Sequence, residues 1–345
     1  MKKWVKSILL KNIRKNFVDY PSIQNYPFDL KSNNFGYFKS FGVENMDKTF
    51  YVIWRDNYGS GFFSNFVFVV SHIVIAKKMG LIPVVDFQNF KTLYNEKLAI
   101  NNSENAWNYY FESISEFNLE EVYQSKNVFF CDGKYPKNSS FNLTEIKEAI
   151  ELKNELKTNK FVQEFIANGL DIDQQFLGIQ FRGQEQNKAT GHSFGPTYNQ
   201  VLNATKFLLD KYKLNKIFLV TEELEIIEFF EKHFPNQVFY SDNYRLKRQN
   251  AYINTDVRSN HRYNLGLEIL KDAHLLAKCK GILYSDSNVN EYARYIDNNF
   301  EFECEIYNGV NSRNPIIAGY SYNLKKRIPK KLGGLLGELI LKENK

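Results

Sequence analysis

Short apolar runs of strand length alternate in this chain with helix-length segments, and this alternation constrains the fold more than any other feature. The first example begins with a strand-like run at residues 49–54. A very apolar segment of helix length follows and ends near Met79, and a second strand-like run occupies residues 82–87. Gly80 stands where a helix C-terminus favours glycine. A strand, a helix and a strand in this order predict a βαβ unit, which implies a parallel sheet.

The alternation returns after residue 170. We expect strands at residues 176–181, 216–221, 237–242, 281–286 and 301–307, with helices at 198–213, 222–234 and 262–279. Residues 18–48 are polar and rich in Asn, and we expect a lead-in loop there, whereas residues 88–150 show less regularity. The whole pattern predicts an α/β protein with two Rossmann-like halves that join near residues 150–170.

Three predicted helix starts carry residues that typically cap exposed backbone N–H groups. The candidates are Ser64 or Asn65 for the first helix, Thr197 with Gln200 for the helix at 198–213, and Asn288 with Glu291 for a short helix after the strand at 281–286.

Length and composition fit two folded domains. The chain has 345 residues, and 43% apolar residues with 30 Phe and 22 Tyr are ample for two cores. The scattered cysteines Cys131, Cys279 and Cys304 show no zinc spacing and favour a reducing compartment. No run reaches the roughly 18 apolar residues of a membrane span, and basic residues interrupt any signal-peptide core. We therefore expect a cytoplasmic protein, and the modest net charge of +6 does not lead us to expect a nucleic-acid partner.

The notable polar clusters all follow predicted strands. They occupy residues 55–64, 182–192, 222–223 and 285–288. In open α/β sheets ligands bind at the carboxyl ends of the strands, where loop amides and helix N-termini point outward. Four such loops from two halves are typical of an enzyme that binds a nucleotide between its domains.

Arg182 is the strongest single candidate, because it follows a strand directly and its guanidinium can fork onto a diphosphate. A salt bridge at a domain interface is the alternative explanation of its position. Gly59 and Gly61 form either a phosphate-binding turn or a tight corner, since two glycines without a third are a weak signal. Ser287 with Asn288 would serve as a helix cap, a phosphate ligand or both.

The histidines and the absent sequence motifs limit which kinds of catalytic and metal site the chain can contain. His72 lies in an apolar helix and is expected to be a core residue, whereas His192 follows Arg182 in a polar loop and is a better candidate for chemistry. The other histidines show no metal-ligand spacing. The sequence has no Walker loop, no D-x-D motif after a strand and no G-x-S-x-G elbow, so we expect no metal and no cofactor.

Several segments resemble the superfamily of fucosyltransferases that use GDP-fucose, which includes the core α1,6-, nodulation-factor, α1,2- and protein O-fucosyltransferases. The segment GIQFRGQEQNK is similar to the family's H-x-R-[RG]-T-D-K motif. The segments GSGFFSN, FLVTEELEIIEFFEKHF and LGLEILKDAHLLAKCKGILYSDSNVNEYA resemble the family's other motifs, in the family's order. The resemblance runs from about residue 50 to residue 300.

The resemblance implies a GT-B-like fold, with two Rossmann-like domains facing a central cleft, and an inverting, metal-independent transfer of fucose from GDP-fucose to a hydroxyl of a glycan. The implied domains are residues 1–165 on the acceptor side, residues 166–310 for the nucleotide sugar, and a basic tail at 311–345. The implied donor-binding residues are Arg182 at the β-phosphate, Ser285, Ser287 and Asn288 at the diphosphate, Glu222 or Glu223 near the nucleoside, Gln180 at the family's base-recognising position, and Gly59 and Gly61 facing the donor.

The chain also departs from the family motif. Gln180 replaces the family's His, and Gln184 with Glu185 replaces its Thr-Asp pair. These departures keep two alternatives open, namely transfer from a different nucleotide sugar and a non-catalytic module that binds nucleotide sugars or glycans. Three residues compete for the role of catalytic base, and the candidates are Glu185, His192 and Asp56.

The C-terminal tail predicts a contact with a membrane surface. Leu332, Leu335, Leu336, Leu339 and Ile340 have the spacing of one helix face, and basic residues precede them. A helix that packs its leucines onto the N-terminal domain is the alternative. Trp4, Val5, Ile8 and Leu9 of the basic N-terminal segment offer a second contact. A peripheral enzyme of polysaccharide biosynthesis, acting on a lipid-linked glycan, would fit this location.

Overall fold

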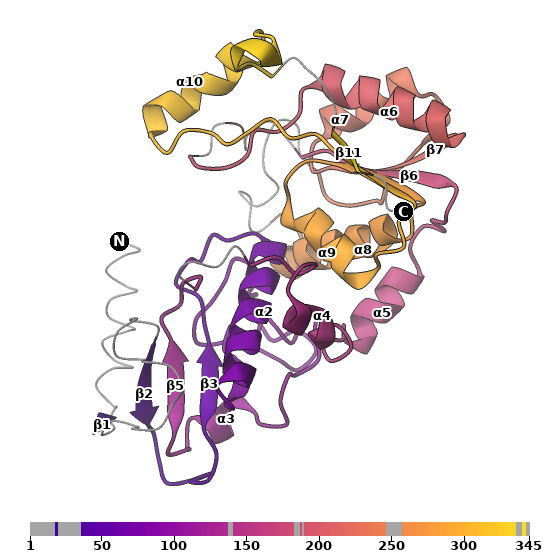
Figure 1. Cartoon of the computed structure of the whole chain (residues 1–345). Coiled ribbons are helices and arrows are strands. Elements are labelled where there is room, and N and C mark those ends of the chain that lie inside the picture. Colours follow the sequence, from indigo (N-terminus) through magenta and orange to yellow (C-terminus); the bar gives the residue numbers. More distant parts are fainter. Residues whose placement is uncertain are drawn as a thin grey trace. The chain divides into compact units, whose positions relative to one another are not determined.

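The computed structural model describes residues 18–19, 36–136, 141–182, 187, 190–245, 257–335 and 340–342. The chain divides into two compact units, unit 1 at residues 1–159 and unit 2 at residues 160–345, and each unit has its own sheet (Figure 1).

Unit 1 contains a five-stranded mixed sheet in the order β1-β2-β5-β3-β4. Its elements are β1 (Val18–Asp19), β2 (Gly36–Ser40), β3 (Phe50–Ile53), α2 (Phe62–Lys78), β4 (Ile82–Val85), α3 (Leu119–Val122), β5 (Val128–Cys131) and α4 (Lys147–Leu152). β3 pairs in parallel with both β4 and β5, which confirms the predicted βαβ unit. The prediction missed β2 and β5. β2 lies in the segment expected to be a loop, and it pairs antiparallel with β5.

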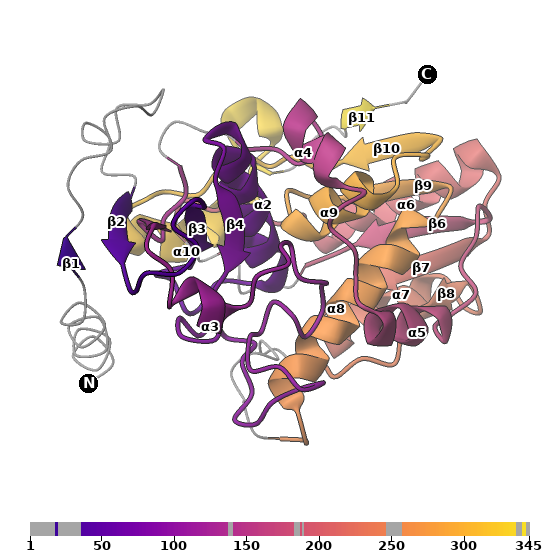
Figure 2. The same cartoon turned by 90° about the horizontal axis from the view of Figure 1, so that it is seen from below.

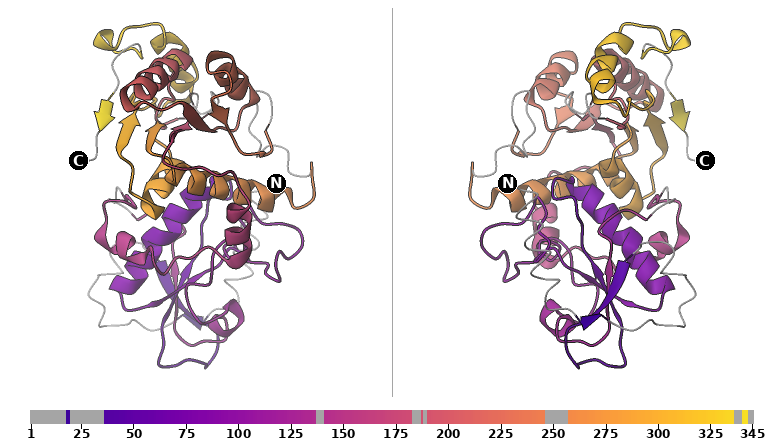
Figure 3. Two further views of the ribbon diagram at one scale, coloured as in Figure 1. Left: turned by 90° about the vertical axis from the view of Figure 1, so that its right-hand side faces the viewer. Right: turned by 90° about the vertical axis from the view of Figure 1, so that its left-hand side faces the viewer.

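Helix α2 packs against β3 and β4 (Figure 3). Its buried residues lie around most of its circumference. It begins at Phe62 with Gly61 as its N-cap, so the expected cap at Ser64 or Asn65 is wrong. The physical reason is that both side chains accept hydrogen bonds from the guanidinium of Arg55 and are not used on the helix backbone.

His72 is a core residue, as predicted. Its Nδ1 accepts from the Tyr51 hydroxyl at 2.8 Å, and its Nε2 donates to the Lys134 carbonyl at 3.0 Å. Burial lowers the pKa of His72 to about 4, so the ring is neutral at neutral pH. Gly80 has φ +67° after the end of α2, which confirms the expected glycine at the helix C-terminus.

Unit 2 contains a six-stranded sheet in the order β11-β10-β9-β6-β7-β8, in which every neighbouring pair except β10 with β11 is parallel. Its elements are α5 (Lys160–Ala167), β6 (Phe176–Gln180), α6 (Tyr198–Tyr212), β7 (Lys216–Val220), α7 (Leu224–His233), β8 (Val238–Phe239), α8 (His261–Ala277), β9 (Gly281–Tyr284), α9 (Asn288–Ile296), β10 (Phe302–Glu305), α10 (Pro315–Lys325), a 3-10 turn (Lys330–Leu332) and β11 (Ile340–Lys342). Each predicted strand of this half is present, with shorter bounds.

Helices cover both faces of the sheet of unit 2 (Figure 1). Leu177 and Ile179 of β6 point to a core shared with α6 and α7. Phe176, on the alternate face, joins a second core with α8 and α9, which lie side by side (Figure 2). This two-residue alternation, with a core on each face, is the arrangement of a doubly wound sheet.

Two helix starts in unit 2 test the predicted caps. Thr197 and Gln200 form a complete capping box at the start of α6, as predicted. For α9 the prediction was wrong by one residue, because Ser287 is the N-cap and Asn288 is the first helical residue. The Ser287 hydroxyl accepts from the backbone N–H of Val289 at 3.3 Å, so a short side chain one position earlier does the capping.

The described residues at both ends of the range from Leu332 to Ile340 contradict the helix predicted there. Leu332 ends the 3-10 turn, Gly333 has φ +79°, and Ile340 belongs to β11, which pairs with β10. A left-handed glycine stops the helix, and pairing with a distant strand overrides the local periodicity. Leu336 and Leu339 lie outside the described residues, as do Trp4, Val5, Ile8 and Leu9.

The cysteine thiols Cys131, Cys279 and Cys304 are all free and buried. Burial raises the pKa of Cys131 to about 12 and that of Cys304 to about 11. The pKa of Cys279 is also raised by burial.

Gly178 allows α8 to pack closely on the middle of β6, because a Cβ atom there would lie 2.6 Å from Leu276 Cδ1 and 3.1 Å from Cys279 Sγ. We predict that Gly178→Ala lowers the free energy of unfolding by about 1–3 kcal/mol through overpacking. Gly319→Ala is the matched control, since no atom lies within 4 Å of its added Cβ. The control should be neutral or stabilising by up to about 1 kcal/mol in urea denaturation. Equal stability of the two variants would contradict the close packing.

Candidate functional site

The strand order of unit 2 creates a switch point. The chain places β7 and β8 on one side of β6 and then returns to place β9 and β10 on the other side. Connections that leave in opposite directions open a crevice at the carboxyl ends of β6 and β9. The residues that follow these two strands begin with Phe181 and Ser285, so the predicted donor-binding loops lie at this crevice.

Arg182 follows β6 and forms a loose ion pair with Glu222, which follows the neighbouring strand β7. The distance from Arg182 Nε to Glu222 Oε1 is 3.9 Å, and the side chains are 39% and 25% exposed. The pair is therefore weak and solvated, and the guanidinium keeps faces that a ligand can reach. Glu223, the next residue, is buried and is the N-cap of α7.

Gln180 and Ser285 are joined by Asn290, a residue that the sequence reasoning missed. Asn290 Nδ2 donates to Gln180 Oε1 at 3.2 Å and to the Ser285 carbonyl at 2.8 Å, and all three residues are buried. This bridge ties the end of β6 to the end of β9 across the switch point. The only sequence signal was an Asn in the first turn of a helix, which is too common to single out.

The N-terminus of α9 directs its positive dipole end toward this edge of the sheet, while the N–H groups of Val289, Asn290 and Glu291 donate to the hydroxyl or carbonyl of Ser287. Asp286, between Ser285 and the Ser287 cap, accepts a hydrogen bond from the Ser193 hydroxyl at 2.5 Å. The long loop after β6 is thereby attached to the loop after β9. This carboxylate also adds negative charge beside the helix start, which the prediction of a phosphate site did not include.

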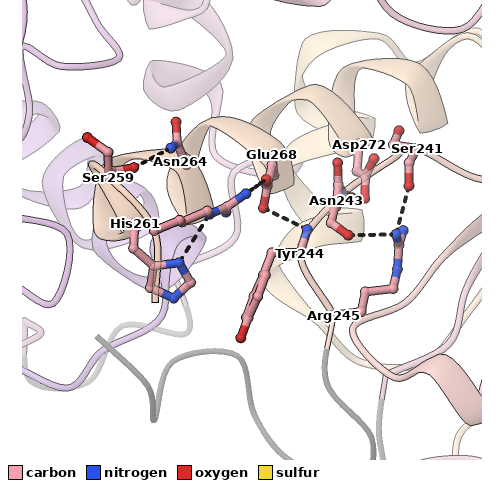
Figure 4. Close-up of polar contacts among 10 residues, drawn as sticks. Ser241, Asn243, Tyr244, Arg245, Ser259, His261, Asn264, Glu268 and Asp272 are labelled. Carbon is pink, nitrogen blue, oxygen red and sulfur yellow. Dashed lines mark hydrogen bonds and ion pairs between the residues drawn. The ribbon is translucent and has the colours of Figure 1, made fainter. Parts of the chain in front are cut away.

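The loop after β8 is held to the end of β7 by Arg245. Its Nε donates to the Thr221 carbonyl at 3.0 Å. Its NH1 donates to the Ser241 carbonyl at 2.7 Å (Figure 4). Its NH2 is buried and has no hydrogen-bond partner among the described residues. The guanidinium thus fixes the two loops next to Glu222.

Asp272 of α8 lies beside the same loop and was also missed by the sequence reasoning. Its Oδ2 accepts from Asn243 Nδ2 at 2.7 Å, while its Oδ1 is buried without a hydrogen-bond partner in the described part of the chain (Figure 4). Burial raises the pKa of Asp272 to about 6, although the Ser241 hydroxyl and, to a lesser degree, the charges of Arg245 and Lys271 lower it in part. A buried carboxylate with an unused acceptor oxygen is costly unless a ligand donates to it.

A second ion pair positions the start of α8. Arg258 NH1 donates to Glu268 Oε1 at 2.6 Å, and the backbone N–H of Tyr244 donates to Glu268 Oε2 at 3.3 Å (Figure 4). The loop that carries Asn243 and Arg245 is therefore attached to α8 at two positions along the helix, Glu268 and Asp272.

The candidates for a catalytic base are placed differently. His192 is exposed, and its carbonyl accepts from the backbone N–H of Asn311, next to the Ser193 that contacts Asp286. Glu185 lies outside the described residues. Asp56 follows β3 in unit 1, where its N–H donates to the Gly133 carbonyl at 3.1 Å.

Unit 1 has its own switch point, because β4 and β5 lie on opposite sides of β3. Arg55 follows β3 and is 8% exposed. Its guanidinium donates to Asn65 Oδ1 at 2.8 Å and to Ser64 Oγ at 3.1 Å, and lies over the rings of Phe68 and Tyr135. The arginine attaches the glycine loop to the first turn of α2.

Gly59 and Gly61 are not required by the fold of unit 1. Neither has a positive φ. A Cβ at Gly59 would approach only Asn57 Oδ1, at 3.9 Å, and nothing lies within 4 Å at Gly61. A turn is present, since the Ser60 N–H donates to the Asn57 carbonyl at 3.4 Å. The open space beside both glycines leaves room for a close approach by a ligand.

Neither membrane spans nor metal clusters are found in the part of the chain that the structure describes. None of its helices combines the length and the apolar character needed to cross a bilayer. No group of three or more His, Cys, Asp and Glu side chains in these ranges is arranged to hold a metal ion.

The fold is similar to that of a solved fucosyltransferase. NodZ α-1,6-fucosyltransferase co-crystallized with GDP aligns over 86% of this chain and 99% of its own, with a TM-score of 0.52 and 14% identity. Fucosyltransferase NodZ from Bradyrhizobium aligns over 86% and 100%, with a TM-score of 0.51 and 15% identity. No protein-family profile matches the sequence, and no curated protein is significantly similar to it. The likeness confirms the expected GT-B-like α/β fold class, and at this identity it shows the fold alone.

We predict that Arg55→Lys lowers the stability of unit 1. An ammonium group cannot reach Asn65 and Ser64 together or stack between two rings, so one buried acceptor is left unpaired at a cost of about 1–3 kcal/mol. Thermal unfolding of the full chain measures the loss. Lys153→Met, which removes an exposed cation from the same unit, is the control and should melt as the wild type does. A wild-type melting temperature for Arg55→Lys would contradict the role of this guanidinium.

Proposed function

We propose that the protein is a metal-independent, inverting glycosyltransferase that moves fucose from GDP-fucose to a hydroxyl group of a glycan. The observation that carries the proposal is the position of Arg182 at the switch point of unit 2, with Glu222 on one side and the N-terminus of α9 on the other. The likeness of the fold to NodZ, a fucosyltransferase co-crystallized with GDP, supports the same donor.

The diphosphate would bind at the crevice between the ends of β6 and β9. Arg182 would turn from Glu222 to the β-phosphate, and the remaining oxygens would lie at the Ser287 hydroxyl and the positive end of the α9 dipole. Charge builds up on the β-phosphate as the glycosidic bond of the donor breaks. The Arg182 guanidinium and the helix dipole would stabilise this charge, so the leaving group needs no metal ion.

The nucleoside would extend across the ends of β7 and β8. In a doubly wound sheet, an acidic residue after the strand next to the phosphate-binding strand contacts the ribose hydroxyls, and Glu222 has this position. Asp272 and Arg245 lie one strand further on. The unused Oδ1 of Asp272 would accept from the N–H groups of guanine, and the unused NH2 of Arg245 would donate to its O6. Adenine presents no such donor pair, so this geometry favours GDP.

Gln180 would contribute less to base recognition than the motif suggested. Its Oε1 is already used by Asn290 at the switch point, so only its amide N–H groups remain to donate to the donor. Because Gln180 does not identify the base by itself, transfer from a different nucleotide sugar remains the alternative. Incubation with a panel of nucleotide sugars, followed by detection of the released nucleoside diphosphate, distinguishes the two donors, and release from none of them supports a non-catalytic module.

The acceptor hydroxyl would lose its proton to one of the three candidate bases, Glu185, His192 or Asp56. A base contributes typically about 10²- to 10⁴-fold, and positioning of donor and acceptor contributes the rest. Unit 1, with the open space beside Gly59 and Gly61, would bind the acceptor.

We predict that Arg182→Ala lowers kcat/KM by roughly 30- to 1000-fold, because about 2–4 kcal/mol of leaving-group stabilisation is lost. Arg182→Lys keeps the charge but loses the fork and should fall between this variant and the wild type. Lys232→Ala, at the exposed end of α7, is the control for loss of a cation. The measurement is release of GDP from GDP-fucose by correctly folded variants. Wild-type turnover in Arg182→Ala would exclude the proposed role.

We predict that transfer survives chelation by EDTA, because Arg182 and the N-terminus of α9 neutralise the diphosphate. Initial rates measured before and after dialysis against EDTA should be equal. If activity disappears on chelation and returns with Mg²⁺ or Mn²⁺, the proposed binding of the phosphates is wrong.

We predict that binding of GDP strengthens as the pH rises from 5 to 7, with a midpoint near the Asp272 pKa of about 6. Only the ionised carboxylate accepts from both guanine N–H groups. The raised pKa has the opposite effect on folding, since the folded state binds more protons than the unfolded state between pH 4 and 6, and stability therefore falls as the pH rises. Titration calorimetry of Asp272→Asn should show weaker binding of GDP and no such dependence. An unchanged pH profile in Asp272→Asn would assign the titration to another group.

A further inference from the structure

Helix α10 exposes a row of large apolar side chains. Ile316 is 75% exposed, Tyr320 76% and Leu324 66%, and Ile317 between them is 55% exposed. At 3.6 residues per turn these four positions fall within an arc of about 100° on the helix surface. Figure 1 shows the helix at the margin of unit 2. Exposed apolar residues are common singly, but a contiguous row on one helix face indicates an interaction surface.

The opposite side of α10 is already packed. Ala318 and Tyr322 are buried, the Tyr322 ring stacks on Phe194 with centroids 6.2 Å apart, and Leu335 completes this small core. Asn311 Nδ2 also donates to the Ala318 carbonyl at 3.2 Å. The helix is thus attached to its unit through one face, and the apolar row is on another face that the unit itself does not cover.

The start of the helix is also fixed. Asn314 is the N-cap and accepts from the N–H of Ile316 at 2.9 Å, and Pro315 occupies the first helical position. The row is therefore presented by a helix with a defined start.

The stretch of sequence that contains α10 carries charge of one sign. The sequence contains no Asp or Glu between Glu305 and Glu338, whereas it contains Arg313 before the helix and five basic residues at its end and just after it. These five are Lys325, Lys326, Arg327, Lys330 and Lys331. Arg327 and Lys331 are exposed, and Lys325 lies over the Phe194 ring at 4.9 Å.

We propose that the exposed face of α10 binds the surface of an anionic membrane. An apolar face flanked by cations and free of acidic residues matches a helix that lies in the lipid interface, with its side chains among the acyl chains and its cations at the headgroups. Eleven residues are too short to span a bilayer, so the helix lies in the plane of the membrane. Tyr320 has the amphipathic ring that is favoured at such an interface.

The positive charge is what favours lipid over a second copy of the chain. Two copies that met through α10 would bring the same cations together, which is unfavourable, whereas an anionic surface neutralises them. This surface replaces the C-terminal leucines that the sequence pattern indicated. The inference does not depend on the proposed transfer reaction.

The test is flotation of the full-length protein with two kinds of vesicle, pure phosphatidylcholine and phosphatidylcholine mixed with phosphatidylglycerol. We expect binding to the mixed vesicles at low salt, weaker binding at high salt and little binding to phosphatidylcholine alone. The variant Ile316→Ser/Leu324→Ser removes apolar area from the row, and the variant Arg327→Glu/Lys331→Glu reverses two exposed charges. Each should lower the partition coefficient about tenfold or more.

Two matched controls distinguish binding through this surface from non-specific binding to vesicles. Val43→Ser/Leu98→Ser removes two apolar side chains of unit 1 that are 78% and 80% exposed. Lys153→Glu/Lys232→Glu reverses two exposed charges elsewhere. Both controls should retain wild-type binding to the mixed vesicles. Circular dichroism melting should show that every variant is folded, and binding of GDP in solution should be unchanged, so that loss of lipid binding is distinct from loss of the donor site.

Three results would overturn the proposal. The first is a wild-type protein that stays with the soluble fraction on mixed vesicles at low salt. The second is lipid binding that neither α10 variant weakens. The third is a concentration-dependent dimer, detected by light scattering, that Ile316→Ser/Leu324→Ser abolishes while vesicle binding is absent, which would assign the face to a second copy.

Discussion

The parallel pairing of β6 with both β7 and β9 is the constraint on which unit 2 depends. Because the side chains of β6 alternate between two cores, helices must cover both faces, and the chain must change direction at β6 to bury them. Because β6, β7 and β9 run parallel, their carboxyl ends lie at one edge, and the change of direction opens a crevice there between β6 and β9. Arg182, Glu222 and Ser285, which are far apart in the sequence, become neighbours there without any need for direct contacts to bring them together.

Much of the fold was predictable because it rests on local patterns. Four- to six-residue apolar runs such as β6 and β7 identify buried strands, and the Thr197–Gln200 capping box marks a helix start through contacts within one turn. The failures have a common cause in distant contacts. Ser64 and Asn65 have the chemistry of a cap but bind Arg55, and Ile340 has helical spacing but pairs with β10. No local pattern records such competition.

The candidate site divides in the same way. Arg182, Ser287 and the acidic pair at 222–223 follow strands directly, so the sequence alone could place them at the carboxyl edge. Asn290, Arg245 and Asp272 could not be found, because each acts through a partner on another element, namely Gln180, Thr221 and Asn243. The proposed guanine contacts rest on two hydrogen-bonding atoms without a partner among the described residues, Asp272 Oδ1 and Arg245 NH2. Only the three-dimensional structure can identify such atoms.

The buried thiols have a consequence for following how the chain opens. A thiol reacts with alkylating reagents as the thiolate, and the raised pKa values of Cys131 and Cys304 leave almost none of it at neutral pH. The folded protein should therefore be inert to such reagents. The rate at which each cysteine is alkylated then reports how fast that cysteine becomes accessible through unfolding. Because Cys131 belongs to unit 1 and Cys279 and Cys304 to unit 2, mass spectrometry of the labelled peptides would time the opening of each unit separately, without any added probe.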